Sequence, residues 1–165
     1  MITLLRLDER LIHGQIAIKW SRHTGVNHIV VLSDSAAANP IIQKSLMMAA
    51  PSTCKVAIKS MDAGLKLLQD PRCHAMKILV LVQTPDDLLK VVENAPDIEK
   101  INVGNYGRVA AKRSEQERTR YGNNLYCYDD EKETLKKVME AAGNIECIYQ
   151  TIPDEQPEKL RDVLK

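Results

Sequence analysis

Length, composition and charge restrict what this chain can be. It has 165 residues, of which 44% are hydrophobic, so it can bury the core of one domain and is too short to suggest two. The formal net charge is +1 and the charges are interleaved, which argues against nucleic acid or an anionic bilayer as a partner. No signal-peptide core and no membrane-spanning apolar run is evident. We therefore expect one cytoplasmic domain covering residues 1–165.

Seven apolar runs of strand length alternate with segments of helical period. In chain order they span residues 2–7, 27–33, 55–59, 76–82, 99–104, 124–128 and 144–150. Several of them, notably 76–82, are apolar on consecutive residues, as expected where helices cover both faces of a parallel sheet. The alternation predicts an α/β domain with an open, doubly wound sheet and right-handed crossovers.

Helices are expected between these runs, where start signals precede apolar residues at helical spacing. Residues 15–23 can form the first helix. The later start signals are Asn39 with Pro40, Thr84 with Pro85, and Asp129 or Asp130. Gly143 is a typical residue to end the last of these helices.

The four cysteines are scattered along the chain and form no CxxC pair. They are Cys54, Cys73, Cys127 and Cys147. Their spacing, with that of the four histidines, does not match a zinc site, so buried free thiols are the favoured interpretation. We expect no metal ion and no cofactor.

His13 lies in the loop between the first strand and the first helix. Parallel sheets bind ligands in such loops, beyond the carboxyl ends of their strands. The helix over residues 15–23 would point the free amides of Gly14 and Gln15, with the positive end of its dipole, toward the loop. Together with Arg10, three residues earlier, these donors would make His13 suited to accept a phosphoryl group.

From the residues alone, His13 has a second interpretation, in which the ring caps the helix or packs on the loop. Asp34 also has two. It ends the second strand and should lie beside the first loop, where it could orient His13 or Arg10 by a charged hydrogen bond. Alternatively, it caps the helix that begins in "SAAANP".

The block "LDERLIHGQ" at residues 7–15, with Trp20 and the segments "VVLSD", "AAPS" and "INVGN", resembles one known family. It is similar to the IIB subunits of the mannose, fructose and sorbose family of the bacterial sugar phosphotransferase system (PTS). The resemblance covers nearly the whole chain, and the D-x-R-L-I-H-G-Q block is highly specific to that family. It implies a sheet of about seven strands, mostly parallel, with an antiparallel strand at one edge.

The resemblance also implies a protein-histidine phosphotransferase. His13 matches the residue that accepts a phosphoryl group from a phosphohistidine of the IIA protein or domain and passes it to a sugar imported by the membrane subunits IIC and IID. Arg10 matches the arginine that pairs with the phosphoryl group, and Asp8, Gly14 and Gln15 complete the loop. Such a subunit is cytoplasmic and peripherally associated with the membrane permease. Neither the sugar nor homo-oligomer formation can be predicted from the sequence.

Two features of the chain depart from the family pattern. Gly104 and Asn105 stand where members often carry a Gly-Gly pair, and the following segment, residues 106–124, is longer than usual. A loop of this length is either functional or a solvated, charged face. Leu11 and Ile12 also leave two alternatives: they form part of a docking patch for IIA around an exposed His13, or they anchor the loop inward.

Other classes of protein fit the sequence less well. A histidine phosphatase would carry arginine directly before the histidine, where this chain has Ile12. A receiver domain would need an acceptor aspartate at the end of the third strand, and "KVAIKS" has none. A binding module with an idle His13 is the non-enzyme alternative, and phosphoryl uptake from a phosphorylated donor would distinguish it.

Overall fold

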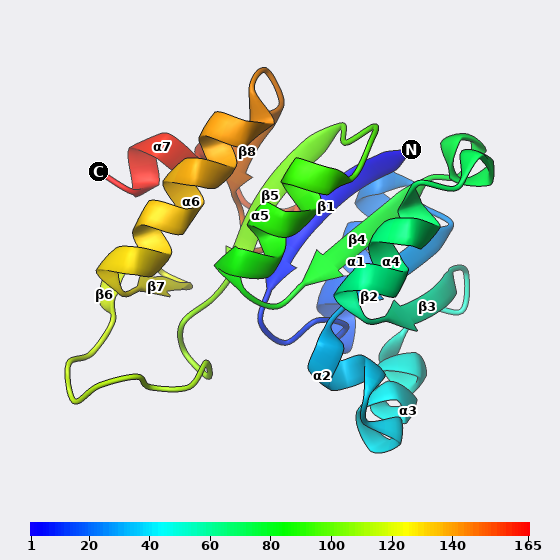
Figure 1. Ribbon diagram of the computed structural model, residues 1–165, viewed down its shortest axis with the longest axis horizontal. Coiled ribbons are helices and arrows are strands. Elements are labelled where there is room, and N and C mark those ends of the chain that lie inside the picture. Colours follow the sequence, from blue (N-terminus) through cyan, green and yellow to red (C-terminus); the bar gives the residue numbers. More distant parts are fainter.

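The computed structural model describes all 165 residues, built around one seven-stranded sheet (Figure 1). The strand order is β3-β2-β4-β1-β5-β8-β9, and every neighbouring pair is parallel except β8 and β9. The strands are β1 (Ile2–Asp8), β2 (His28–Leu32), β3 (Lys55–Lys59), β4 (Ile78–Val82), β5 (Lys100–Asn105), β8 (Glu146–Tyr149) and β9 (Glu158–Lys159). The predicted mostly parallel sheet with an antiparallel edge strand is confirmed.

One predicted strand does not belong to this sheet. The run at residues 124–128 forms β7 (Leu125–Cys127), which pairs with β6 (Thr119–Gly122) in a separate antiparallel ribbon. Its place as seventh strand is taken by β9, which consists of only two exposed, charged residues. Because β9 lies at the edge and buries no side chain, it leaves no apolar pattern from which it could be predicted.

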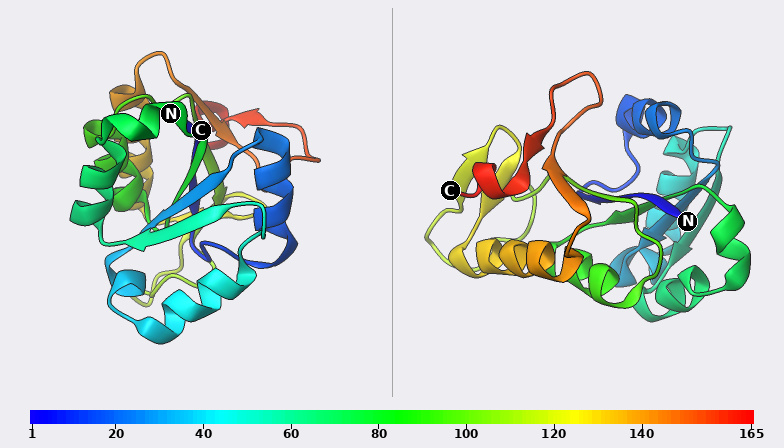
Figure 2. Two further views of the ribbon diagram at one scale, coloured as in Figure 1. Left: turned by 90° about the vertical axis from the view of Figure 1, so that its right-hand side faces the viewer. Right: turned by 90° about the horizontal axis from the view of Figure 1, so that it is seen from above.

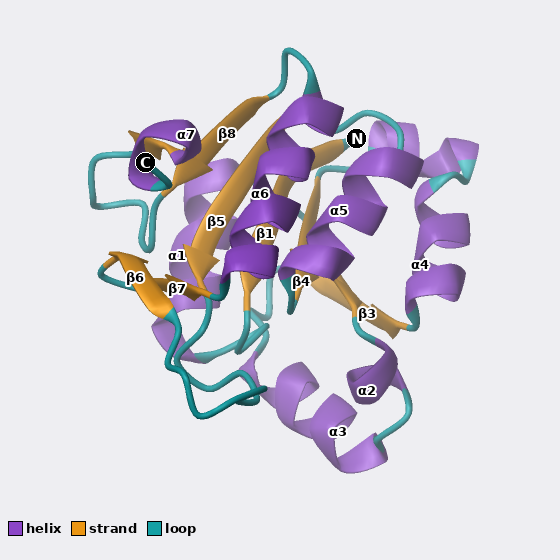
Figure 3. Cartoon of the chain, turned by 60° about the vertical axis from the view of Figure 1, so that its left-hand side comes forward, coloured by secondary structure: helices purple, strands orange, loops and turns teal.

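Helices cover both faces of the sheet. On one face lie α4 (Met61–Leu68), α5 (Pro85–Asn94) and α6 (Asp129–Ala142), and on the other lies α1 (Gly14–Thr24) (Figures 2 and 3). Shorter elements are α2 (Asp34–Ala37), α3 (Pro40–Ala49), α7 (Leu160–Val163) and a 3-10 helix at Pro71–Ala75. No helix is long and apolar enough to cross a bilayer.

Two predicted helix starts are confirmed by their capping hydrogen bonds, whereas α6 begins at Asp129 itself, after Tyr128, and not after Asp129 or Asp130. The Asn39 side chain accepts from the first amides of α3, and the Thr84 hydroxyl accepts from the Asp87 amide in α5. Proline follows each of these caps, at a position where the missing N–H costs no hydrogen bond. Gly143 ends α6 with a positive φ of 59°.

Two apolar clusters hold the layers together. One contains 24 buried residues and lies under α4, α5 and α6; the other contains 12 and lies under α1, where Trp20 and Leu46 take part. All four cysteines are free: Cys73 and Cys127 are buried and the other two are half-buried. Burial raises the pKa of the Cys127 thiol to about 12. These thiols therefore contribute as small apolar side chains.

The sheet topology places the first loop at a switch point. β1 leads into α1 on one face, whereas its neighbour β4 leads into α5 on the other, so the two following loops diverge (Figures 1 and 3). Ligands of open α/β sheets bind in the crevice that such divergence creates. The Gln83 side chain after β4 donates to the carbonyl oxygen of Glu9 after β1. This hydrogen bond links the two loops that flank the crevice.

Candidate functional site

His13 stands at the end of the first loop, as the residue directly before α1. Its backbone is extended, and its side chain does not cap the helix. The ring is partly accessible, with 20% of the side chain exposed. Nε2 lies 3.0 Å from Oδ2 of Asp8, whereas Nδ1 makes no hydrogen bond. The structure thus excludes the capping role and leaves one ring nitrogen available.

Asp8 is buried and accepts hydrogen bonds from three donors. Oδ2 accepts from Nε2 of His13 and from Nη2 of Arg6, and Oδ1 accepts from the Arg10 amide. Burial raises the pKa of this carboxyl, but the His13 hydrogen bond and the Arg6 charge outweigh burial and lower the pKa below its ordinary value. Asp8 is therefore an anion that fixes the tautomer of His13, with the proton on Nε2 and the lone pair on Nδ1.

Arg6 is the counter-ion beneath Asp8, and the sequence analysis did not single it out. Its guanidinium is buried, donates to Asn102 and to the carbonyl oxygens of Gln150 and Thr151, and lies 4.8 Å from the ring centroid of Trp20. Burial lowers its pKa despite the neighbouring carboxylate. The available signal was that Arg6 is the only charged residue in the run 2–7, because a buried charge requires charged or hydrogen-bonding partners.

Gly104 makes room for this arginine. The pairing of β1 with β5 shifts in register between Leu7 and Asp8, and Gly104 falls at the shift. A Cβ on Gly104 would lie 2.2 Å from the Arg6 guanidinium. Glycine is required here because a guanidinium occupies the space of a side chain.

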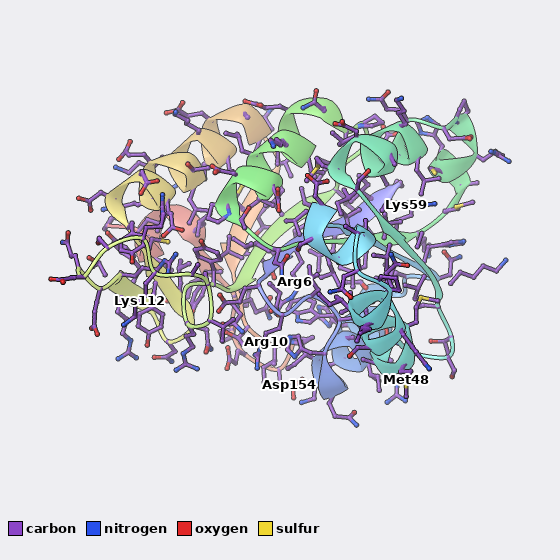
Figure 4. All side chains as sticks on the ribbon, turned by 60° about the horizontal axis from the view of Figure 1, so that its bottom comes forward. Arg6, Arg10, Met48, Lys59, Lys112 and Asp154 are labelled. Atoms are coloured by element: carbon purple, nitrogen blue, oxygen red, sulfur yellow. The ribbon has the colours of Figure 1, made fainter.

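Arg10 reaches across to β5. The side-chain oxygen of Asn105 accepts from its Nε at 2.9 Å and from its Nη2 at 2.8 Å, which leaves Nη1 unpaired. Asn105 is buried, whereas Arg10 is exposed at the centre of the face seen in Figure 4. The asparagine that departs from the family's Gly-Gly pair thus holds the arginine of the loop.

The loop between these residues is a tight turn fastened from below. The Leu11 amide donates to the Asp8 carbonyl oxygen, and Leu11 adopts a positive φ of 59°, rare for a residue with a branched side chain. Leu11 and Ile12 are 4% and 3% exposed and belong to the cluster under α1. The docking-patch interpretation is therefore wrong, and the inward-anchor alternative is confirmed. Gly14, with a positive φ, and Gln15 are exposed at the start of α1.

Asp34 does not belong to this site. Its Oδ1 accepts from the Met61 amide at 2.8 Å, at the start of α4, and it makes no hydrogen bond to His13 or Arg10. The helix beginning in "SAAANP" is capped by Ser33 instead. Both predicted roles of Asp34 are wrong, because the path of the chain after β2 turns its carboxylate toward β3 and α4.

Comparison of this chain with known proteins shows its family. The family model described as "PTS system sorbose subfamily IIB component" matches residues 2–165. The chain belongs to this family of PTS IIB components. Among solved structures of the family, the IIB domain of the sorbose permease from Klebsiella pneumoniae has a TM-score of 0.87 at 20% identity, with 99% of this chain and 96% of that chain covered.

Two further relatives differ in how much of this chain they match. A probable phosphotransferase enzyme IIB component of Streptococcus pyogenes serotype M6 is 41% identical over 108 residues, 66% of each chain. The mannose-specific EIIAB component of Escherichia coli K12 is 27% identical over 164 residues, which are 99% of this chain and 48% of that one. The chain thus spans about half the length of that two-part relative.

Proposed function

We propose that the chain, acting as one IIB domain of residues 1–165, accepts a phosphoryl group on Nδ1 of His13 from a phosphohistidine of a IIA protein and passes it to a sugar. The observation that carries this proposal is the hydrogen bond between Nε2 of His13 and the buried carboxylate of Asp8. It leaves Nδ1 as the only ring nitrogen with a free lone pair. The partial exposure of the His13 side chain would allow a second protein to reach this nitrogen.

In the proposed transfer, Nδ1 of neutral His13 forms a bond to phosphorus while the bond from phosphorus to the donor imidazole breaks. The donor ring, which is cationic at the start because its other nitrogen is protonated, leaves as a neutral imidazole, and the His13 ring, which keeps its proton on Nε2, becomes cationic. The Asp8 carboxylate at 3.0 Å stabilises that charge as it develops. The onward step, in which the bond from phosphorus to Nδ1 breaks and His13 returns to its neutral form, uses the same contact, which suits a relay.

The charge on the phosphoryl oxygens would be met by two groups of donors. The unpaired Nη1 of Arg10 offers one, while Asn105 holds the rest of the guanidinium in place. The first amides of α1 offer others, because that end of the helix has no side-chain cap and no acidic residue in its first turn. Gly14 and Gln15 would contribute these backbone donors.

We further propose that the sugar is taken up by membrane IIC and IID subunits, with which this chain associates at the membrane surface. Relatives are named for mannose, N-acetylgalactosamine, fructose and sorbose, so membership of the family leaves the sugar open.

Phosphoryl transfer from a ³²P-labelled IIA protein tests the proposal. The wild-type chain should take up label that is lost in acid and kept in alkali, as expected of a phosphorus–nitrogen bond, and His13→Ala should take up none. Label that survives acid but is lost to alkali or hydroxylamine would place the phosphoryl group on a carboxylate and overturn the assignment to His13.

A further inference from the structure

The carboxylate of Glu9 is bound by the backbone of the long segment that follows β5. Glu9 is 5% exposed, and its two oxygens accept from four consecutive amides at 3.0 to 3.3 Å. The donors are Gly107, Arg108, Val109 and Ala110. Four successive amides directed at one anion form a nest, which holds the backbone in a defined shape.

The same residue is part of the loop that carries the site. Glu9 stands between Asp8 and Arg10, and its own amide donates to the carbonyl oxygen of Asn105. Its carbonyl oxygen accepts from the Gln83 side chain. The contacts that fix the loop, made by the backbone of Glu9, and the contacts that fix residues 107–110, made by its side chain, therefore meet in one residue.

The far end of the segment is held separately. Arg118 lies 4.4 Å from the ring centroid of Tyr128, pairs with Glu131 at 2.8 Å and donates to the carbonyl oxygen of Ala110 at 3.1 Å. Residues 111–117, between the two attachments, are exposed, and so is Val109 within the nest, at 69%. In Figure 4 this segment, marked by Lys112, lies on one side of Arg10, and Met48 lies on the other side.

We propose that Glu9 is a positioning residue that holds residues 107–110 as a fixed wall beside His13, against which the phosphorylated IIA donor docks. This inference rests on the proposed function. The wall needs the carboxylate, because without it four amides lose their acceptor, and Arg118 holds residues 107–110 only at the carbonyl oxygen of Ala110. A donor would then have to order the segment on docking, at a cost to affinity. The chemical step depends on Asp8 and Arg10 and should be spared.

Glu9→Gln is the decisive variant, because it keeps the shape of the side chain but turns one acceptor into an NH₂ group that faces N–H donors. It should raise KM for phospho-IIA about fivefold, since the donor must order the segment, and leave kcat within about twofold. Amide hydrogen exchange should accelerate at residues 107–110. Glu9→Asp, which keeps the charge, should recover part of the lost affinity. Glu146→Gln is the matched control, because Glu146 is exposed and pairs with Lys100 at the opposite end of the strands.

A second variant leaves the nest intact. Val109→Asp changes an exposed side chain on the proposed wall, so it should fold normally and raise KM for phospho-IIA, with kcat unchanged. An unchanged KM in Val109→Asp, or in a folded Glu9→Gln with faster exchange at 107–110, would overturn the inference, as would a fall in kcat alone. These outcomes differ from failure of the proposed function, in which the wild-type chain itself would take up no phosphoryl group.

Discussion

Replacing Asp8 by asparagine should affect both stability and phosphoryl transfer. The carboxylate and the Arg6 guanidinium beneath it are each 1% exposed, so the change leaves a buried cation without its counter-ion. Breaking a buried ion pair costs about 3–5 kcal/mol. Arg6 keeps its acceptors on Asn102, Gln150 and Thr151, which places the expected loss at the lower end, about 3 kcal/mol. That loss lowers the folding equilibrium constant by about two orders of magnitude.

Urea unfolding followed by fluorescence of Trp20, the only tryptophan, measures this loss. Asp154→Asn is the matched control, because Asp154 is exposed and pairs only with Lys19, so its loss should stay below about 1 kcal/mol. The rate of labelling by phospho-IIA should fall roughly a hundredfold or more in Asp8→Asn, because no anion remains to orient the His13 ring and stabilise its charge.

The pH dependence carries a sign that can be checked. Because the folded-state pKa of Asp8 lies below its unfolded value of about 3.9, its contribution to stability is fully present above that pH. It is lost as pH falls through the folded-state pKa. The difference in unfolding free energy between wild type and Asp8→Asn should therefore be constant near neutrality and narrow below about pH 4. A variant within 1 kcal/mol of wild type at pH 7, or one that is labelled at the wild-type rate, would refute the reasoning.

Arg10→Lys should slow labelling about tenfold or more at unchanged melting temperature, because a lysine cannot bond Asn105 and a phosphoryl oxygen at once; a wild-type rate would remove Arg10 from the site. Ile12→Asp should lose about 4 kcal/mol in urea unfolding, because it buries an unpaired carboxylate, whereas Ile41→Asp, at a side chain 80% exposed, should lose almost nothing. Equal losses would contradict the inward orientation of Ile12. Gly104→Ala should cost about 2–3 kcal/mol and slow labelling, because the new methyl overlaps the Arg6 guanidinium; wild-type stability would show that the space is not filled.

Local chemistry explains which elements were predictable from the sequence. Asn39 and Thr84 predict helix starts, because capping depends on a few neighbouring residues. The consecutive apolar residues of β4 predict a strand that is covered on both faces. The block at residues 7–15 predicts a site of His13, Arg10 and Asp8, and hydrogen bonds of the His13 ring and the Arg10 amide to Asp8 join these residues within one short loop. Residues close in sequence are necessarily close in space, so their proximity could be predicted without knowing the fold.

The tertiary structure alone decided the contacts between distant segments. Three such contacts are the pairing of β8 with β9, the hydrogen bond of Asp34 to the start of α4, and the four amides that bind Glu9. The two partners in these contacts are 9 to 101 residues apart along the chain. No periodicity or cap encodes such contacts, because they depend on strand order and on the register shift at Gly104. Even the inward turn of Ile12 required knowledge of the apolar cluster beneath it. The sequence determined which groups could carry the chemistry, and the packing of β1 between β4 and β5 determined how they are held, because burial and register are properties of the assembled sheet.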